Sequence, residues 1–392
     1  MERNDRQTME RVMKWAFALI ATGLLSGCDG NSYHPEFKGL PHKGRQTMSV
    51  TGLHMDTLLI DGSSTSLIGD WLLKGDRLYF VDQSLCGLRS FDLDGEYLGR
   101  HIRSGRGPNE WPSPFVKAKF HGDELVAVDG NWFFTVYDSS YVRQGEPFNL
   151  LQSYGLGNRG WQDLLRHPDV EAPAMYEYNL EASNIVKVGD MFVIPVVTEH
   201  VSYNGLSRTS HSRDFWRRSY TFMRLDVHGG GTAELFGHYP EIYTEKNIPI
   251  FASYSFDRCA DGIVTSFGAD SLLYVRDTTG RPLYTFGYSA RGMSHDYPET
   301  NTIDSYMENY QGYREKYSYY TDIKSVGEYL FRSYKLDGED RYGLQIYKGH
   351  DLIGEVATGD PLTVLGEYGG YWYASIPADI ENDLLRIVKF RL

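Results

Sequence analysis

Cysteine is scarce in this sequence, which contains only three in 392 residues. So few cysteines exclude a fold held together by a dense disulfide framework. Cys86 and Cys259 lie far apart in strand-like segments and are predicted to be two separate buried thiols, with one long-range disulfide as the alternative. The sequence also lacks the HExxH motif, clustered cysteine and histidine ligands, a P-loop and a dinucleotide-binding fingerprint. These absences argue against a metal or nucleotide enzyme that a local motif would identify.

Basic residues are outnumbered by acidic ones. The chain has 39 lysines and arginines against 52 aspartates and glutamates, which gives a formal net charge of −13. This balance disfavours non-specific binding to nucleic acid or to anionic headgroups, so no nucleic-acid partner is predicted. Hydrophobic residues make up 41% of the chain and aromatic residues 14%, which excludes a disordered protein and indicates a folded one.

Long apolar runs are absent as well. Beyond residue 27 the longest run, Met191–Val197, has the size of a buried strand and is interrupted by Pro195. The run Trp15–Leu25 has eleven residues, well short of the roughly 20 that span a bilayer as a helix. Basic residues precede it, and that order is typical of a secretory signal peptide. Residues 1–27 are therefore predicted to be a signal peptide.

The apolar run ends in Leu25-Ser26-Gly27-Cys28, which resembles a bacterial lipobox. Small residues before the cysteine allow an extended chain to enter a membrane peptidase, and a thiol can form a thioether to diacylglycerol. The resemblance implies cleavage between Gly27 and Cys28 and stable anchoring by two or three acyl chains on Cys28. A cysteine that follows an ordinary signal peptide by chance is the alternative. Residues 28–47 are predicted to be a flexible tether and residues 48–392 the folded domain.

A turn-and-strand unit recurs along the rest of the chain. A glycine turn precedes a short run rich in β-branched and aromatic residues, as at Gly75-Asp76 before Leu78–Val81. The turn glycines of the six units stand at positions 75, 122, 189, 262, 327 and 369. The shortest spacings match a propeller blade of roughly 40 to 50 residues, and the longer ones indicate insertions. Alternation with a period of two predominates, so the fold class is predicted to be all-β.

The ends of the array indicate how the ring closes. Each unit contains a further hairpin, such as the one at Asp94-Gly95. The last unit stops after the strand Leu384–Phe390 and lacks an outer strand, whereas Leu53–Ile60 precedes the first complete unit as a surplus strand. Pairing these two strands closes the ring and protects the sheet edges. The prediction is a six-bladed β-propeller of four-stranded blades, closed by its N- and C-terminal strands.

Residues 104–111, which read Ser-Gly-Arg-Gly-Pro-Asn-Glu-Trp, follow the first unit. Together with the lipobox and the repeats over residues 50–392, this segment resembles the TolB-like six-bladed propeller lipoproteins of bacteria. The residues that carry the signature are Gly105, Gly107, Pro108 and Glu110. Two glycines and a proline favour a fixed corner in which Glu110 binds backbone amides, so the segment is interpreted as structural rather than as a site. The resemblance implies the fold and a cell-envelope location, and it implies no defined activity.

Insertions are candidates for binding, because loops carry most binding residues of a propeller, and the first of them, residues 151–183, is rich in glycine. One candidate binding cluster lies in the insertion 201–219. It places four arginines around Phe215-Trp216, and Trp216 with Arg217 forms its centre. An arginine and tryptophan cluster suits an anionic or carbohydrate ligand. A solvated hairpin tip is the alternative.

A second candidate is the insertion that follows residue 300. Its tyrosines recur every three or four residues, at positions 306, 310, 313, 317 and 320. In a helix this spacing places the rings along one stripe, so Tyr306, Tyr310 and Tyr313 form a candidate platform for a sugar or a peptide. The alternative is a helix packed against the propeller rim with its hydroxyl groups at the edge.

These patterns favour a binding or scaffold module over an enzyme. We predict a lipid-anchored propeller in the cell envelope, at the outer membrane, that recognises a protein, peptide or glycan through one loop face. No catalytic residue, metal ligand or cofactor is predicted. The alternative is a calcium-dependent hydrolase or lactonase whose ligands come from several blades and leave no local motif. That enzyme requires three or more Asp, Glu or Asn side chains at one mouth of the central channel, and no such convergence is predicted.

Overall fold

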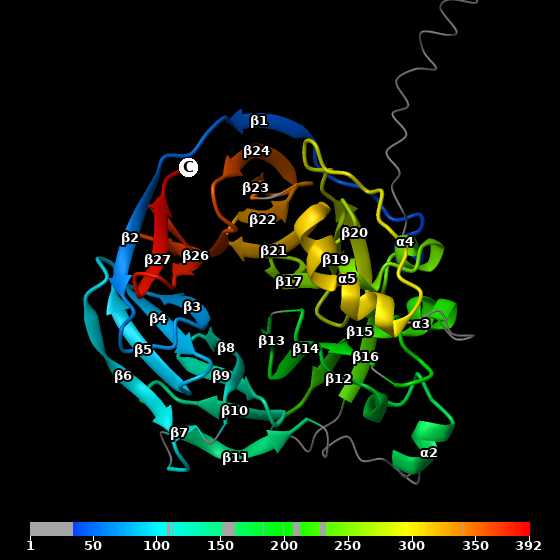
Figure 1. Cartoon of the computed structure of the whole chain (residues 1–392), viewed down its shortest axis with the longest axis horizontal. Coiled ribbons are helices and arrows are strands. Elements are labelled where there is room, and N and C mark those ends of the chain that lie inside the picture. Colours follow the sequence, from blue (N-terminus) through cyan, green and yellow to red (C-terminus); the bar gives the residue numbers. More distant parts are fainter. Residues whose placement is uncertain are drawn as a thin grey trace, which may run out of the picture. The chain divides into compact units, whose positions relative to one another are not determined.

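The computed structural model describes residues 34–392 except positions 108, 109, 112, 151–160, 183, 199, 207–211, 228–232 and 339. The predicted signal peptide, the cleavage site after Gly27 and the lipidation site at Cys28 lie outside the described residues, as does Pro108. The described residues form a ring of β-sheets (Figure 1).

Each sheet is a blade with four principal strand positions, and the blades follow one another around the ring. Blade 1 contains β3 (Gly69–Lys74), β4 (Arg77–Asp82), β5 (Gly87–Asp92) and β6 (Tyr97–Ser104), with β7 (Glu110–Trp111) parallel to β6. Blade 2 contains β8 (Phe115–His121), β9 (Glu124–Asp129), β10 (Phe133–Tyr137) and β11 (Arg143–Asn149). Blade 3 contains β12 (Glu177–Tyr178) and β13 (Val186–Val188), which both pair with β14 (Met191–Val197), then β15 (Tyr220–Leu225) and β16 (Ala233–His238).

The second half of the ring follows the same plan. Blade 4 contains β17 (Tyr254–Cys259), β18 (Gly262–Phe267), β19 (Leu273–Arg276) and β20 (Pro282–Phe286). Blade 5 contains β21 (Tyr319–Val326), β22 (Tyr329–Lys335), β23 (Tyr342–Lys348) and β24 (Asp351–Thr358), with β1 (Gln46–Val50) parallel to β24. Blade 6 contains β25 (Thr363–Tyr368), β26 (Tyr371–Asp379), β27 (Leu384–Phe390) and β2 (Met55–Asp61). The predicted six-bladed all-β propeller is confirmed.

The central strands explain why the repeat is visible in the sequence. All six residues of β18 and five of the six in β9 are buried, because neighbouring blades cover both faces of these strands. Such strands read as nearly continuous apolar runs. The turns before β4 and β9 require left-handed backbone, and Gly75 and Gly122 supply it with φ angles of +56° and +60°.

The ring closes as the sequence predicts. β2 pairs antiparallel with β27, from Met55 opposite Phe390 to Asp61 opposite Leu384. The N-terminal strand thus becomes the outer strand of blade 6 (Figure 1).

Residues 34–50 form an N-terminal strap that crosses the outer strands of blades 3, 4 and 5. Phe37 is fully buried, and the carboxylate of Glu36 forms an ion pair with Arg276, with Oε2 and Nη2 2.6 Å apart. The amide of Lys43 donates to the carbonyl oxygen of Thr285 at 2.8 Å. The flexible tether predicted for residues 28–47 is therefore wrong for residues 34–47, because their apolar and charged side chains have partners on the blades.

Apart from η1, which lies in the N-terminal strap, the helices lie in insertions of blade 3 and in the segments that flank blade 4. They are α2 (Trp161–Arg166), α3 (Ser212–Arg218), α4 (Glu241–Glu245), α5 (Ile303–Lys316) and the 3-10 turns η1 (Pro35–Phe37), η2 (Pro173–Met175) and η3 (Pro249–Phe251). None of the helices in the described part of the chain is long and apolar enough to cross a membrane.

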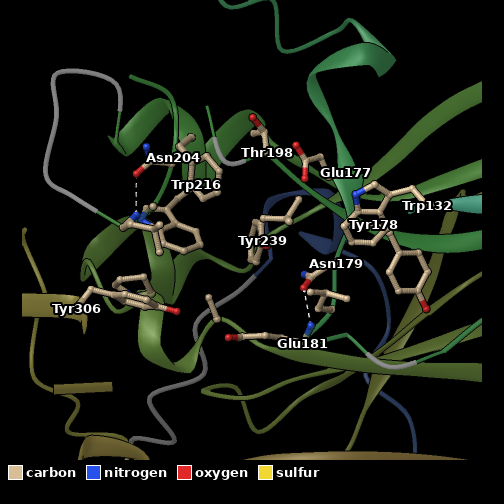
Figure 2. Close-up of a pocket in the computed structure, with 17 residues that line it drawn as sticks. Trp132, Glu177, Tyr178, Asn179, Glu181, Thr198, Asn204, Trp216, Tyr239 and Tyr306 are labelled. Carbon is tan, nitrogen blue, oxygen red and sulfur yellow. Dashed lines mark hydrogen bonds between the residues drawn. The ribbon is translucent and has the colours of Figure 1, made fainter. Parts of the chain in front are cut away.

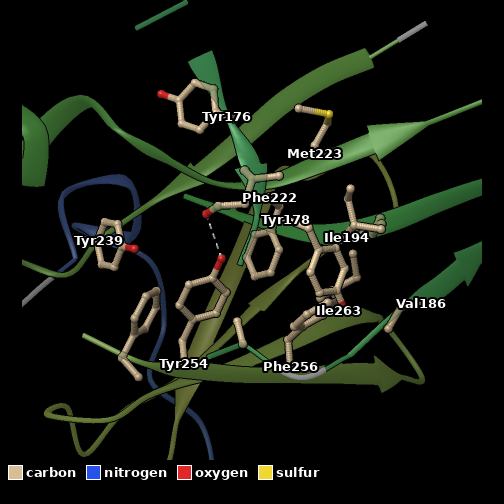
Figure 3. Packing of buried hydrophobic residues seen from close by; sticks show 14 of the residues in the cluster. Tyr176, Tyr178, Val186, Ile194, Phe222, Met223, Tyr239, Tyr254, Phe256 and Ile263 are labelled. Carbon is tan, nitrogen blue, oxygen red and sulfur yellow. Dashed lines mark hydrogen bonds between the residues drawn. The ribbon is translucent and has the colours of Figure 1, made fainter. Parts of the chain in front are cut away.

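The largest apolar cluster joins blades 2, 3 and 4 with these helices. Figure 3 shows the part of it where blades 3 and 4 meet. The rings of Phe222 and Phe256 lie 4.9 Å apart across the boundary between blades 3 and 4. Cys86 is buried and Cys259 is partly buried, and both are free thiols, as predicted. The insertions are thus held to the ring by the same core that joins the blades.

Candidate functional site

The described residues of the glycine-rich segment 104–111, at the end of blade 1, are joined to one another by hydrogen bonds. The amide of Gly107 donates to Oε2 of Glu110 at 2.8 Å, and the amide of Gly105 donates to the carbonyl oxygen of Trp111 at 2.9 Å. Gly105 has a φ of +153°, a backbone conformation that residues with a side chain rarely adopt, and it lies against the Glu110 carboxylate. The indole of Trp111 is buried against Phe115 at the start of blade 2. This geometry is that of a corner between blades.

The structure separates the two residues at the centre of the insertion 201–219. Trp216 on α3 is buried, and its Nε1 donates to Oδ1 of Asn247 at 2.9 Å. Its ring stacks on Tyr243 with centroids 5.4 Å apart. Arg217 is exposed. Consecutive positions on a helix point in different directions, so the two side chains do not form a joint site for an anion.

The tyrosine stripe forms the packed face of α5. Thr302 caps the helix by accepting a hydrogen bond from the amide of Ser305 at 3.0 Å. The tyrosines at positions 306, 310, 313 and 317 are half-buried against the core that joins blades 2 to 4. Tyr320 lies beyond the helix and is buried in β21. The stripe therefore attaches the helix to the rim.

A cavity of about 300 Å³ lies where α5, α3 and the inner strand of blade 3 meet (Figure 2). Its aromatic lining consists of Trp132, Tyr178, Phe215, Trp216, Tyr239 and Tyr306. Its polar lining consists of Glu177, Asn179, Glu181, Thr198 and Asn204. Trp216 and Tyr306 from the sequence analysis thus line one cavity. Arg217, Tyr310 and Tyr313 are not among the lining residues.

Blade 3 fixes the polar side of this cavity. Glu177 lies on β12, opposite Val197 of β14. The next turn is held by Asn179, whose amide donates to Pro195 and whose Oδ1 accepts from the amide of Glu181 at 3.0 Å. Such side-chain bonds to the backbone fix a turn without regular secondary structure. The two glutamates are therefore held in place by a strand and a closed turn.

Aromatic residues line the cavity on two sides, with Trp132 beside Glu177 and Tyr178, and Trp216 and Tyr306 across from them (Figure 2). A methyl group at Gly205 would overlap the ring of Trp216, so glycine allows the indole to lie against the backbone. Trp132 has left-handed backbone with φ of +62°, a conformation that is uncommon for a bulky residue. The turn between β9 and β10 holds this conformation, because the amide of Trp132 donates to the carbonyl oxygen of Asp129 at 2.9 Å.

The charged side chains in the described lining of the cavity are acidic. Its described lining contains two carboxylates, Glu177 and Glu181, and no lysine, arginine or histidine. The hydroxyl of Tyr310 donates to Oε1 of Glu181 at 2.8 Å. Burial and this neighbouring carboxylate raise the pKa of Tyr310 to about 12, so its hydroxyl remains a donor at neutral pH.

Sequence reasoning missed most of these lining residues. Glu177 and Glu181 lie in a segment without a recognisable motif, and Tyr239 looks like any other tyrosine of a core. The signal that pointed to this region was the extra length of the chain in blade 3 and before blade 5, because insertions form loops that can carry binding residues.

The central channel tests the calcium alternative. A second cavity, of about 120 Å³, has a polar lining of Lys117, Lys119, Asn184, Asp322 and Lys324 from the innermost strands and the loop before β13. The adjacent Asp257 lies 2.9 Å from Nζ of Lys119 and 3.6 Å from Nζ of Lys324. The lining of this cavity thus contains two side chains of the Asp, Glu or Asn type, fewer than the three that the calcium alternative requires.

The lysines in the channel also argue against a calcium site. The ammonium groups of Lys119 and Lys324 lie within ion-pair distance of Asp257, and that of Lys117 lies 2.9 Å from Asp70. All three would repel a divalent cation. Burial raises the pKa of Asp257, but Lys119 and Lys324 outweigh burial and hold it below its usual range. Among residues 34–392 with their gaps, no group of three or more His, Cys, Asp or Glu is arranged to hold a metal ion. The geometry is that of a network of ion pairs.

Asp322 is the channel carboxylate in which burial outweighs the nearby lysines and disfavours the ionised form. Burial raises its pKa to about 6, although Lys117 and Lys324 favour the ionised form. The folded state therefore prefers the protonated acid, and its stability falls as the pH rises from about 4 to about 6. We expect Asp322→Asn to increase the free energy of unfolding at pH 7.5 by about 1–2 kcal/mol, with a gain that shrinks at pH 4. Urea titrations at pH 7.5 and at pH 4 measure the free energy of unfolding of both proteins. A gain of equal size at the two pH values, or a loss at pH 7.5, would contradict this expectation.

Comparisons with known proteins support the fold. No protein-family model matches the chain, and no curated protein matches its sequence. A member of the DUF4221 family from Bacteroides vulgatus is similar in structure, with a TM-score of 0.64 and 13% identity over 87% of this chain and 98% of that chain. A candidate exported protein from Bacteroides fragilis has a TM-score of 0.52 and 12% identity over 90% of this chain and 98% of that chain. The chain therefore shares the six-bladed β-propeller fold with these bacterial proteins.

Proposed function

We propose that this protein is a binding module of the bacterial cell envelope that captures a segment of a polypeptide partner in the cavity beside α5. The cavity itself carries the proposal. Ligand sites are typically concave and largely apolar, with a few fixed polar groups, and their volumes begin at roughly 300 Å³. This cavity combines six aromatic side chains with two carboxylates held by blade 3. Its size suits one side chain or one sugar ring, so only part of a larger partner enters it.

A polypeptide is favoured over a glycan by the surface around the cavity. Leu180 lines the mouth and is 62% exposed, and Met307 on α5 is 71% exposed. Exposed apolar side chains beside a pocket are typical of protein interaction sites. A glycan presents mainly hydroxyl groups and gains little from such a rim, so it is the alternative outcome of the test.

The experiment compares binding to an array of peptides and an array of glycans, with the intact chain and with Ala252→Trp. Ala252 lines the cavity, so the indole should fill it and reduce peptide binding at least tenfold. Ala260→Trp, at an exposed turn of blade 4, is the matched control. Thermal unfolding shows whether each variant is folded. Unchanged peptide binding by a folded Ala252→Trp protein would contradict the proposed site.

A location in the envelope is supported by the predicted signal peptide, by the lipobox and by the resemblance to TolB-like lipoproteins. The structural relative from Bacteroides fragilis is described as a candidate exported protein, which agrees with this location. We propose anchoring through acyl chains on Cys28 and residence at the outer membrane. The lipid would keep the propeller near partners in the envelope without a membrane-spanning segment.

Anchoring predicts a clear result for one substitution. Cys28→Ala removes the thiol that acylation requires, so we expect the protein to move from the membrane fraction to the soluble fraction. Cys86→Ala changes another thiol and should leave the protein in the membrane fraction. Fractionation with and without detergent measures this, and a Cys28→Ala protein that stays with the membrane would contradict lipid anchoring. Protease digestion of intact and lysed cells then shows which side of the outer membrane the propeller faces.

A further inference from the structure

We propose that Ser289 and His295 form a nucleophile and its general base, and that together they hydrolyse carboxylic esters with a short acyl chain. The two residues lie on the connection from β20 to α5 (Figure 1), and neither lines the cavity beside α5. This activity goes beyond the proposed binding function and does not depend on it. It is carried by the hydrogen bond between the two side chains, by the group that orients the histidine and by the exposure of the serine.

The hydroxyl of Ser289 lies within hydrogen-bond reach of the imidazole of His295. Oγ of the serine and Nε2 of the histidine are 3.1 Å apart. On the other side of the ring, Nδ1 lies 3.2 Å from the carbonyl oxygen of Ala269. A carbonyl oxygen can only accept, so Nδ1 carries the proton of the neutral ring and Nε2 accepts from the serine hydroxyl. A base at this distance, itself oriented by a third group, is the arrangement that activates a serine.

His295 is a neutral base at pH 7. Burial is the largest influence on its pKa and lowers it, and the charge of Arg332 acts in the same direction. The bond to the Ala269 carbonyl and the charge of Asp270 oppose this shift without reversing it. Nε2 is therefore unprotonated at pH 7 and can take the proton of the serine hydroxyl.

The backbone on either side of Ser289 is tied to blade 5. The amide of Tyr288 donates to the hydroxyl of Tyr347 on β23 at 3.3 Å. The amide of Ala290 donates to the hydroxyl of Tyr320 on β21 at 3.0 Å. Strands of a rigid blade thus hold the serine in place, although its own side chain is exposed. A nucleophile needs such a fixed position relative to its base.

Exposure separates this pair from the other serine–histidine contacts in the described part of the chain. Ser289 is exposed, so a substrate can reach its hydroxyl. Ser90, which lies 2.8 Å from the ring of His101, is fully buried. Nδ1 of His200 accepts from the amide of Ser202 and also contacts its hydroxyl, as in a local turn. Neither of these two serines combines an open hydroxyl with a base that it alone contacts.

The surroundings of Ser289 limit the acyl group. Neither Ser289 nor His295 lines one of the larger cavities among the described residues, so no deep pocket there takes up a long acyl chain. The amide of Ser289 donates to no other group in the described ranges. An amide beside the nucleophile can stabilise the oxyanion that forms when the serine attacks a carbonyl carbon. A short-chain ester is therefore the substrate class that this site suits.

The reaction needs no reactant besides the ester and water. Oγ of Ser289 attacks the carbonyl carbon while its proton passes to Nε2 of His295. The bond to the alcohol oxygen then breaks, that oxygen takes the proton from Nε2, and the acyl group remains on Oγ. Water attacks this acyl ester and gives a proton to Nε2, the bond to Oγ breaks, and Oγ recovers the proton as the acid leaves. The net reaction converts an ester and water into an alcohol and a carboxylic acid.

A fluorophosphonate probe, applied to the full chain in detergent, tests the nucleophile because it reacts with activated serines. We expect mass spectrometry to find the label on Ser289, and His295→Asn to slow labelling about a hundredfold or more. Asparagine can still donate to the Ala269 carbonyl, so this variant removes the base and keeps that bond. Ser139→Ala, at an exposed serine in a hairpin of blade 2, is the matched control and should leave labelling unchanged. No label on Ser289, or equal labelling of a His295→Asn protein that thermal unfolding shows to be folded, would overturn the pair.

Hydrolysis of p-nitrophenyl acetate and p-nitrophenyl decanoate, each corrected for the rate in buffer, tests the substrate class. We expect the acetate to be hydrolysed at least tenfold faster than the decanoate. Ser289→Ala should lower the rate with the acetate at least tenfold, and Ser139→Ala should leave it unchanged. No hydrolysis above that in buffer, or equal rates for Ser289→Ala and the wild type, would overturn the ester activity. Faster hydrolysis of the decanoate would overturn the preference for a short acyl chain.

Discussion

Replacement of Arg332 by methionine is expected to lower the free energy of unfolding by about 3–5 kcal/mol. Arg332 lies on β22, is fully buried and joins blade 5 to blade 4. Its guanidinium donates to Oγ of Ser266 at 2.8 Å and to the carbonyl oxygens of Ser271 at 2.6 Å and Asp270 at 2.5 Å. It also lies 3.2 Å from the ring centroid of Tyr320. Methionine fills similar space but leaves three buried acceptors without this donor.

Two controls separate these contacts from side-chain volume. Arg332→Lys retains the charge but cannot place donors on three separated acceptors, so we expect a loss nearly as large. Arg391→Met removes an arginine beside Tyr371 near the end of the chain, where the expected change is within about 0.5 kcal/mol. Denaturant titration of the three variants measures the differences. A loss for Arg332→Met no larger than that for Arg391→Met would show that the interblade bonds contribute little.

The second large effect is expected in the central channel, where Asp257 binds two lysines. Asp257→Ala leaves Lys119 and Lys324 without their carboxylate, and we expect a loss of about 3–5 kcal/mol. Asp257 also accepts from the amide of Ser325 at 3.1 Å, so its removal affects the junction between blades 4 and 5. Burial lowers the pKa of Lys119 to about 8, and the Asp257 carboxylate opposes that shift, so removing Asp257 should lower this pKa further.

The partner substitution makes this prediction specific. Lys119→Met removes the ammonium group that pairs with Asp257. The double variant removes both charges of this pair, so neither is left buried without its partner. We therefore expect the double variant to be more stable than Asp257→Ala alone, with a coupling energy above about 1 kcal/mol. Strictly additive losses from the two substitutions would contradict the pairing. Unfolding free energies of the wild type, both single variants and the double variant provide the complete cycle.

The ring itself was predictable because its signals are local. Turns such as Gly75 and Gly122 require left-handed backbone, and the strands after them are buried on both faces, so each blade repeats a glycine followed by an apolar run. Closure was predictable because one strand is missing at the C-terminus and one is surplus at the N-terminus. Both arguments need only the sequence of a single repeat and the ends of the array.

The strap was not predictable in the same way. Glycines and prolines in residues 34–47 resemble those of a linker, whereas Phe37 is fully buried and Glu36 pairs with Arg276, some 240 positions further along the chain. The channel shows the same limit. Alternation places Lys119 on one face of β8, but only the closed ring places it beside Asp257. Contacts between distant segments depend on the tertiary structure and leave no local signal.

The candidate site could be predicted only in part. The sequence marked Trp216 and Tyr306 because they stand in long insertions, and both line the cavity. It paired Trp216 with the exposed arginines of α3, although the helix turns the indole inward and the arginines outward. The acidic character of the cavity comes from Glu177 and Glu181 in another insertion. The anionic or carbohydrate ligand predicted for Trp216 and Arg217 together is therefore not supported by a joint site.

A pair of substitutions on exposed leucines tests the proposed binding site most directly. Leu180 is exposed and lines the cavity, whereas Leu59 is similarly exposed on β2 of blade 6, away from it. The measurement is the dissociation constant of the best peptide from the array, determined by calorimetry for Leu180→Asp, Leu59→Asp and the wild type. The account predicts binding three- to tenfold weaker for Leu180→Asp and unchanged for Leu59→Asp, because only Leu180 offers apolar surface beside the cavity. Equal affinities for the two variants would contradict it.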